Sequence, residues 1–469
     1  MSAANAAIPH RDAFIPCRRR DLIDLCLKSG KLDDAASQQF REFCALLSAL
    51  YHFRFHRVSE TIKQSYAPFD PNVDVPLFSM GDSEVGDLDK MRSELIDQVR
   101  HLLERANYNE LSQGSLRRSL EAKSLIELRT EVDFDDFDQI LCYYRGDAST
   151  TVTTGRWFWK RERQVELFER VVLLIHFKDA AYFETRDANR DAALRRFIPG
   201  RAYVYFYKHI PKHDVELLFP NVKTKMTWKD IAMLSLPALV AGASIVIKVL
   251  PQLLIVLSAI MLAIGLPEVL DYFNTSRGEV VDLMPVLIAV GSLCVALGGF
   301  AYKQYSSYKT KKLTFQKNVT DTLFFRNLAN NAAVFQLLID LAEEEECKEV
   351  ILVYYHLLTS QSALTPARLD QKIEAWMTAH LKASVNFDVA DATRKLAELA
   401  ADIPKSSVEK ASESGDDYWR SPPGGNKPVL KEHCALLQYD EQGRCQLLPL
   451  GEALMVLDQL WDDAFRYAL

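Results

Sequence analysis

The sequence predicts an α+β membrane protein in which two oily stretches separate a helical and β-rich N-terminal part from a helical C-terminal part. The first stretch runs from Ile231 to Pro267 and has Lys248 as its only charged residue. The second runs from Leu283 to Tyr302 and carries no charge. A helix that crosses the hydrocarbon core of a bilayer needs about 20 apolar residues. We therefore expect a two-span transmembrane helical hairpin within residues 230–303.

The composition outside these stretches is that of a globular protein. The chain has 469 residues, is 48% hydrophobic and 25% charged, and carries a formal net charge of -7. This acidic balance disfavours a nucleic-acid partner, which requires a basic surface. The eight cysteines are scattered without a CxxC pair, so the sequence predicts reduced thiols and neither a metal site nor a disulfide framework. No cofactor is expected.

Residues 1–135 have a helical pattern. A first helix around Leu22–Cys26 should end at Gly30, and a second should begin at Asp33 or Asp34. The second helix has a wide apolar stripe for burial. This stripe consists of Phe40, Phe43, Leu46, Leu47, Leu50, Phe53 and Phe55. Two more helical stretches are expected at Asp87–Ala106 and Ser115–Leu128.

Residues 136–229 are richer in β-branched and aromatic residues, which predicts a small antiparallel sheet followed by a basic collar. Gly146-Asp147 is typical of a hairpin turn between two strands. Asp187–Arg196 should form a helical insertion. The expected strands are Ile140–Arg145, Thr150–Trp159, Val165–Lys178 and Arg201–Lys208.

The charges beside the oily stretches predict the orientation of the hairpin. Lysine and arginine dominate residues 201–229 and 303–317, whereas the connecting loop 268–282 is acidic. Basic residues stay on the cytoplasmic or matrix side of a membrane. We therefore expect a multi-pass protein whose two soluble parts face that side, with the acidic loop across the bilayer. Residues 231–267 form either one kinked span or an interfacial helix followed by a span.

The C-terminal part is expected to be mainly helical. Residues 304–362 should form a helical segment whose helices, Asn318–Leu341 and Glu344–Leu358, are separated near the acidic run Glu343–Glu346. Residues 363–469 have the element order of a winged-helix-like module with a mobile linker at 404–428. Its expected elements are helices Asp370–Leu381, Ala390–Leu399 and Leu450–Tyr467, a short strand Val385–Val389, and a hairpin of Cys434–Tyr439 with Cys445–Pro449.

Eight short blocks in order along nearly the whole chain resemble one family. They are Phe14–Pro16 with Arg18–Leu22, Tyr144–Gly146, Phe206–Pro220, Tyr308–Leu313, Leu323–Asn331, Lys348–Tyr355, Phe387–Leu399 and Leu460–Tyr467. The sequence is identified as similar to the domain of unknown function 3754 family, the transmembrane protein 143-like membrane proteins. This resemblance implies a protein of the bacterial cell membrane, or of a mitochondrial membrane in a eukaryote. It supplies no activity and no catalytic residue. The chain departs from the family pattern in its longer linker around Pro404–Pro428.

Two groups of residues are candidates for contact with a lipid or a protein partner. Lys208, Lys212, Asp214 and Glu216 lie in the collar, where lysines are suited to anionic headgroups. Asn330 and Asn331 follow the second oily stretch and should lie in a helix. The alternative for the collar is a structural joint, and the alternative for the asparagines is satisfaction of backbone groups.

The sequence contains no GxxxxGK[ST], GxGxxG or GxSxG motif, so no common nucleotide-binding or serine-hydrolase site is predicted. The leading hypothesis is a membrane-anchored interaction or scaffold protein with a protein partner or a second copy of itself. The alternative is a lipid-handling or small-solute transport protein that uses the collar and the hairpin. An unrecognised membrane-bound enzyme is a third hypothesis.

Overall fold

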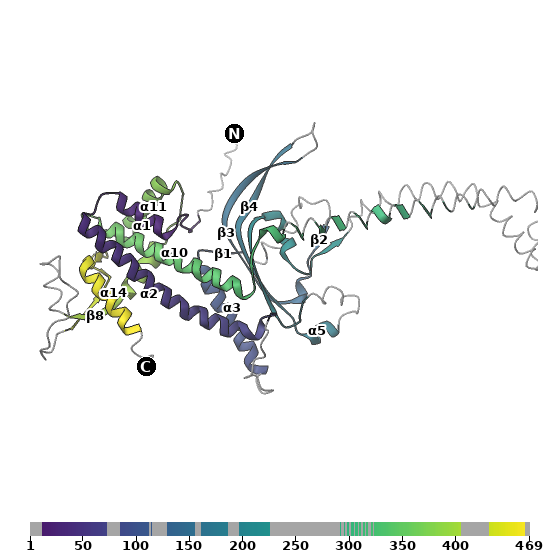
Figure 1. Cartoon of the computed structure of the whole chain (residues 1–469), viewed down its shortest axis with the longest axis horizontal. Helices are drawn as coiled ribbons and strands as arrows, with labels where there is room; N and C mark the ends of the chain where they lie inside the picture. The colour runs from purple at the N-terminus through teal and green to yellow at the C-terminus, as the bar shows by residue number, and fades with distance from the viewer. Residues whose placement is uncertain are drawn as a thin grey trace, which may run out of the picture. The chain divides into compact units, whose positions relative to one another are not determined.

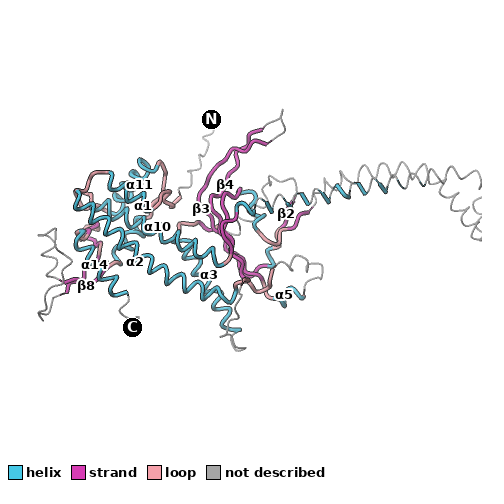
Figure 2. The backbone as a smooth tube through the Cα atoms, in the orientation of Figure 1, coloured by secondary structure: helices cyan, strands magenta, loops and turns pink. Residues whose placement is uncertain are grey.

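The computed structural model describes residues 12–72, 85–111, 114, 129–154, 161–185, 197–225, 323–404 and 431–464, with single positions between 291 and 321. The chain divides into two compact units. Unit 1 comprises Met1–Arg117, Phe134–Lys212 and Arg326–Leu469, and unit 2 comprises Arg118–Asp133 and His213–Phe325. Figure 1 labels the helices and strands, and Figure 2 colours them by type.

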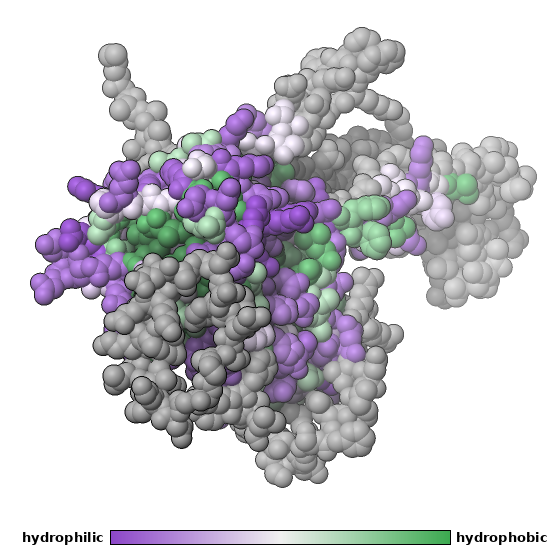
Figure 3. Space-filling model, turned by 60° about the vertical axis from the view of Figure 1, so that its left-hand side comes forward, coloured by the Kyte–Doolittle hydropathy of each residue, from purple (hydrophilic) through white to green (hydrophobic). Residues whose placement is uncertain are grey.

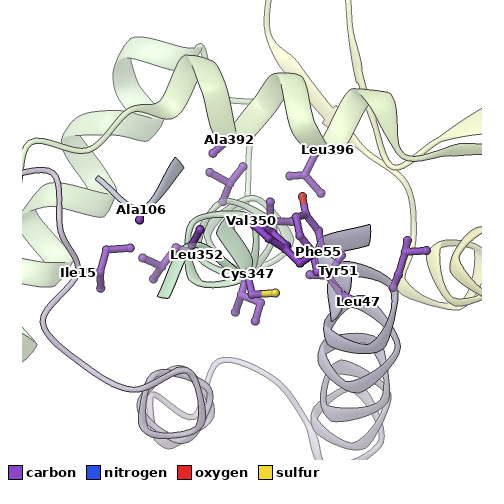
Figure 4. Packing of buried hydrophobic residues seen from close by; sticks show 14 of the residues in the cluster. Ile15, Leu47, Tyr51, Phe55, Ala106, Cys347, Val350, Leu352, Ala392 and Leu396 are labelled. Carbon is purple, nitrogen blue, oxygen red and sulfur yellow. The ribbon is translucent and has the colours of Figure 1, made fainter. Parts of the chain in front are cut away.

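Unit 1 is built around α10 (Ala332–Leu358), a helix from the second half of the chain. Every residue from Glu345 to Leu357 is buried, because other helices surround α10. Those helices are α1 (Arg19–Lys28), α2 (Asp34–Tyr66), α3 (Val85–Arg105), α11 (Pro366–Leu381) and α12 (Val389–Glu398). Figure 4 shows side chains of α10 between those of α2 and α12.

The first two helices begin and end where local sequence signals predict. Gly30 follows α1 with a φ of +68°, a conformation in which glycine is favoured at a helix C-terminus. Asp33 caps α2 by accepting a hydrogen bond from the backbone N–H of Ala36 at 2.7 Å. The predicted stripe on α2 faces the core, since Phe40, Phe43 and Phe55 are fully buried.

Unit 1 also contains a five-stranded antiparallel sheet in the order β1-β3-β4-β5-β7. One face of the sheet shares the hydrophobic core of the helices through residues such as Leu141, Val172 and Val204. The strands are β1 (Asn109–Glu110), β3 (Phe137–Thr154), β4 (Arg161–Phe177), β5 (Ala202–Pro211) and β7 (Asn327–Asn330). The short helix α5 (Ala180–Glu184) follows β4, and the predicted helix at Asp187–Arg196 lies outside the described residues.

The predicted hairpin turn at Gly146-Asp147 is wrong, because β3 continues through it and pairs with β4 on both sides. Gly146 has a φ of +77°, a conformation that glycine adopts readily. Glycines in this conformation are common in turns, but here the glycine allows a neighbouring side chain to approach the backbone closely. A Cβ atom at Gly146 would lie 2.7 Å from the Cβ of Glu169 on the neighbouring strand. The glycine therefore gives the Glu169 side chain room to cross β3.

Two predictions for the next part of the chain are also wrong. They are the single helix Asn318–Leu341 and the helix break near Glu343–Glu346. Asn327–Asn330 form strand β7, since their backbone pairs with Tyr205–Tyr207 of β5. Helix α10 then begins after Asn331 and continues without a break through the acidic run. The run does not end the helix because its carboxylates find cationic or backbone partners from other parts of unit 1.

The C-terminal elements pack into the same hydrophobic cluster as the N-terminal helices. The predicted strand Val385–Val389 is a single bridge between Val385 and Asp12. The C-terminal helix α14 (Leu450–Ala464) packs on α2. The remaining strands form two antiparallel pairs, β8 (Ala400–Pro404) with β9 (Lys431–Ala435), and β10 (Leu437–Tyr439) with β11 (Cys445–Leu447). Residues 405–430, which include most of the predicted linker, lie outside the described residues.

Unit 2 contains a short antiparallel pair, β2 (Arg129–Glu131) with β6 (Lys223–Lys225). The amide of Asn221 donates a hydrogen bond to the carbonyl oxygen of Asp133 at 2.6 Å. A 3₁₀ helix, η4 (Lys212–Leu218), begins at the last residue of unit 1 and continues into unit 2. Val215, Leu217, Leu218 and Phe219 of unit 2 are buried.

The helices of the structure do not support the predicted two-span hairpin. Among the residues that the structure describes, no helix is long and apolar enough to cross a membrane. The two longest, α2 and α10, carry charged residues in their central turns, which a hydrocarbon core disfavours. The fold is therefore a mixed α+β fold, and the multi-pass membrane location is not supported. Residues 226–290 and most of 291–322, on which that prediction rested, lie outside the described part of the chain.

Candidate functional site

Among the described residues, a dense group of buried charged side chains lies inside unit 1, on two turns of α10. It comprises Glu343, Glu345, Glu346, Lys348 and Glu349, each at most 9% exposed. We refer to these five residues as the α10 ionic cluster. Burying charges is costly unless each charge is paired and hydrogen-bonded. The partners of the cluster therefore decide whether it is structural or functional.

Lys348 and Glu345 hold the N-terminal segment against α10. The Lys348 ammonium donates to Glu345 Oε1 and to the carbonyl oxygen of Ile15, both at 2.7 Å, and to the carbonyl oxygen of Cys17 at 3.0 Å. Glu345 Oε2 accepts from the backbone N–H of Ile15 at 3.2 Å. All three donors of the ammonium are thus used. This pair fixes residues 15–17 in place.

The remaining glutamates of the cluster join four further elements, α1, α2, α3 and α12, to α10. Arg105 at the end of α3 binds Glu346 through two hydrogen bonds, of 2.5 and 3.1 Å. Lys395 of α12 lies 3.4 Å from Glu346, 3.2 Å from Glu349 and 2.6 Å from Asp391. Glu343 contacts Arg19 of α1 at 3.4 Å and His52 of α2 at 2.9 Å.

Burial also affects the protonation of the cluster, since the pKa values of Glu345 and Glu349 are both raised. Burial raises the pKa of Glu349 from 4.5 to about 7, against the opposing effects of Lys395 and of Asn107, whose side-chain amide donates to Glu349 at 2.9 Å. The carboxylates near Lys395 outweigh the burial that would lower its pKa, so the pKa of Lys395 is raised. Glu349 and Lys395 therefore form an ion pair mainly above neutral pH, where Glu349 is ionised.

Arg145, from the Tyr144-Arg-Gly block, also fixes the N-terminal segment. Its guanidinium is buried and lies 3.8 Å from the ring centroid of Phe14 and 4.8 Å from that of Tyr108. An arginine at these distances from two aromatic rings gains cation–π attraction from each of them. The sequence predicts no role for Arg145, because Phe14 and Tyr108 are distant from it along the chain.

The buried thiols and imidazoles are in their neutral forms at neutral pH. Burial raises the pKa of Cys17 to about 11 and that of Cys26 and Cys347 to about 12, so these thiols are poor nucleophiles. Burial, followed by Lys372, lowers the pKa of His356 to about 3. In the described part of the chain, no group of three or more histidine, cysteine or acidic residues is placed to hold a metal ion.

The six candidate contact residues from the sequence do not form one site. Lys208 is half-buried on β5, and Lys212 contacts Asp147 at 3.0 Å and Glu166 at 3.2 Å. Asp214 and Glu216 belong to unit 2, where Glu216 is buried. Asn330 is exposed on β7. Asn331 is buried, and its side-chain oxygen accepts from the backbone N–H of Val204 at 3.2 Å.

Two hollows mark the surface of unit 1. One, of about 260 Å³, lies between α1 and α2 and has three arginines in its wall. The other, of about 420 Å³, lies beside the C-terminal end of α10 and β11 and is lined by residues such as Leu358, Ser362 and Gln446. Figure 3 shows one face of the molecule, where hydrophilic residues alternate with smaller apolar areas.

Comparison with known families adds one match. Residues 168–333 match the model of a family described as a protein of unknown function (DUF3754). That part of the chain is similar to a family of unknown function. The match begins in β4 and ends at the start of α10, so it includes all six candidate contact residues and stops before the α10 ionic cluster. It does not confirm the finer resemblance to transmembrane protein 143. No solved structure matches the chain.

Proposed function

We propose that the protein is an interaction protein that associates with a second copy of itself through the open edge of strand β3. The observation that carries this proposal is a two-stranded ribbon that extends beyond the rest of the sheet. Residues 147–154 of β3 pair with residues 161–168 of β4. Among the described strands, β1 pairs only with Tyr143 and Tyr144, and β5 ends opposite Leu167.

The two edges of this ribbon differ in composition. The β3 edge, Ala148–Thr154, reads ASTTVTT and contains neither a charge nor a proline. The β4 edge, Arg161–Glu166, reads RERQVE and contains four charged residues. Natural sheets protect exposed edges with charges, prolines or bulges, because an unprotected edge pairs with other strands. The β3 edge lacks these protective residues and is rich in β-branched residues that favour pairing.

The direction of the backbone groups on β3 follows from its pairing with β1. The N–H of Leu111 donates to the carbonyl oxygen of Cys142 at 2.8 Å, so the polar groups of Cys142 point away from β4. Backbone groups alternate along a strand, and the register with β4 is the same before and after Gly146. Thr150, which is exposed, therefore points its N–H and C=O outward.

A second copy of the chain suits this edge because antiparallel pairing of one strand with itself is self-complementary about a two-fold axis. Such pairing would join two ribbons into a four-stranded sheet. Three or more strands are also far more stable than a two-stranded ribbon by itself. The rigid attachment of the ribbon to unit 1 supports this role, since Lys212 braces its base through Asp147 and Glu166.

Sedimentation velocity of the full chain over a range of concentrations tests the proposal. Wild type should form dimers, whereas Thr150→Pro, which removes an outward N–H, should raise the dimer dissociation constant at least tenfold. Thr150→Val is the matched control, because it keeps the N–H and should dimerise as wild type does. A wild-type chain that stays monomeric at high micromolar concentration, or a Thr150→Pro dimer of unchanged affinity, would refute the proposal.

A further inference from the structure

The hollow between α1 and α2 is positively charged although the chain as a whole is acidic. Its wall contains Arg19, Arg20 and Asp24 from α1, and Arg41, Ala45 and Ser48 from α2. We refer to this hollow as the arginine groove. Three guanidinium groups face a single lining carboxylate there, in a protein whose formal net charge is -7. Such a local excess of positive charge is the electrostatic requirement of an anion site.

The ion pairs of Arg41 and Arg19 leave hydrogen-bond donors of both guanidinium groups available, although Arg19 also contacts Cys347 of α10. Arg41 contacts Asp24 through one nitrogen at 3.3 Å, and Arg19 contacts Glu343 through one nitrogen at 3.4 Å. Both contacts are long and involve a single atom pair, whereas a guanidinium has five N–H donors in a planar fork. The pair of Arg105 and the buried Glu346 shows the alternative, in which two hydrogen bonds join the groups at shorter distances.

Arg19 is held in position before any ligand arrives. Its backbone N–H donates to Glu344 Oε1 at 3.0 Å, and its side chain is anchored to Glu343 of the α10 ionic cluster. Its side chain is 31% exposed, while Arg20 and Arg41 are more open to solvent. The groove therefore combines one fixed arginine with two that can close on a ligand. This arrangement lowers the ordering cost of binding, since part of the site is already formed.

We propose that the arginine groove binds a phosphate monoester group. Guanidinium forks match the geometry of phosphate oxygens and bind them through paired hydrogen bonds. The volume of about 260 Å³ suits a phosphate with a small attached group. Ile23 and Ala45 supply an apolar wall that a short carbon chain would contact. A soluble phosphorylated metabolite and a phosphatidic acid headgroup both present this chemistry.

Calorimetric titration of the full chain with glycerol 3-phosphate tests the soluble source, and flotation with phosphatidic acid in phosphatidylcholine vesicles tests the lipid source. Binding in either experiment supports the site and identifies which source it accepts. In the Arg20→Gln/Arg41→Gln variant the affinity should fall at least tenfold. Arg19 is left unchanged, because its replacement would also disturb the core.

The matched control is Arg57→Gln/Lys63→Gln, which removes two positive charges from exposed positions on α2 that do not line the groove. Its affinity should equal that of wild type. Absence of binding to both probes, or an equal loss in the control and groove variants, would overturn the proposal. Binding of an acidic peptide such as polyglutamate with no binding of either phosphate probe would also overturn it. These outcomes are independent of dimerisation, because Thr150 lies on the sheet and not in the groove.

Discussion

The α10 ionic cluster and the arginine groove use the same residue types in opposite ways. In the cluster, Lys348 and Glu345 are 2% and 1% exposed at their side chains and lie 2.7 Å apart. In the groove, Arg41 and Asp24 are 53% and 41% exposed and lie 3.3 Å apart. Removing one member of a buried pair leaves an uncompensated charge, whereas an exposed charge returns to water. Charges in the cluster therefore determine stability, and charges in the groove are available for binding.

The largest expected effect comes from breaking the buried side of this comparison. Lys348→Met removes the donor to Glu345 and to two carbonyl oxygens, so the free energy of unfolding should fall by about 3–5 kcal/mol. Denaturant unfolding monitored by circular dichroism measures this change. In Lys348→Met/Glu345→Gln the uncompensated carboxylate is also removed, and the loss should be smaller than in the single variant. A loss below about 1 kcal/mol for Lys348→Met would contradict a structural role.

An intermediate effect is expected from the titration of Glu349. Its pKa is raised from 4.5 to about 7 in the folded chain, so the folded state holds a proton that the unfolded state releases between these values. The contribution of this proton to stability is complete below about pH 4.5 and is lost as the pH rises to about 7. Its slope is at most about 1.4 kcal/mol per pH unit. Other charged groups surround Glu349, so the test compares wild type with Glu349→Gln.

In that comparison, the stability of wild type relative to Glu349→Gln should decline from pH 4.5 to pH 7 and then level off. Thermal or denaturant unfolding at several pH values measures the difference. Lys395, Glu345, Glu346 and Asp391 face the same region and are present in both proteins. A stability difference that does not vary with pH would show that Glu349 keeps its ordinary pKa.

The contrast between the two regions also explains what the sequence predicted. Local signals were sufficient for α1 and α2, because Gly30 and Asp33 act on neighbouring residues. The acidic run was interpreted as a break, since an isolated helix tolerates adjacent like charges poorly. Its partners, Ile15 and Arg105, lie 330 and 241 positions away from their glutamates. The turn predicted at Gly146 is wrong for the same reason. The glycine makes room for the side chain of Glu169, which belongs to another strand.

The sequence indicates the six candidate contact residues only by their position near the oily stretches, and it carries no signal for contact between them. The structure divides them between two units and uses Lys212 and Asn331 in contacts within unit 1. The sequence does not predict the arginine groove, although Arg18–Leu22 belongs to one of the blocks that resemble the family. The groove exists only where Arg41 of α2 comes beside Arg19 and Arg20 of α1. Tertiary packing brings together three charges that have no joint pattern in the sequence.

The smallest expected effect sharpens the exposed side of the comparison. Arg41→Gln removes a long, single contact with Asp24 that is open to solvent, so the free energy of unfolding should change by less than about 1 kcal/mol. The same variant should still weaken binding of glycerol 3-phosphate, because Arg41 supplies one wall of the groove. Denaturant unfolding and calorimetric titration of one protein sample measure both quantities. A large loss of stability in Arg41→Gln would mean that the groove, like the α10 ionic cluster, serves the fold rather than a ligand.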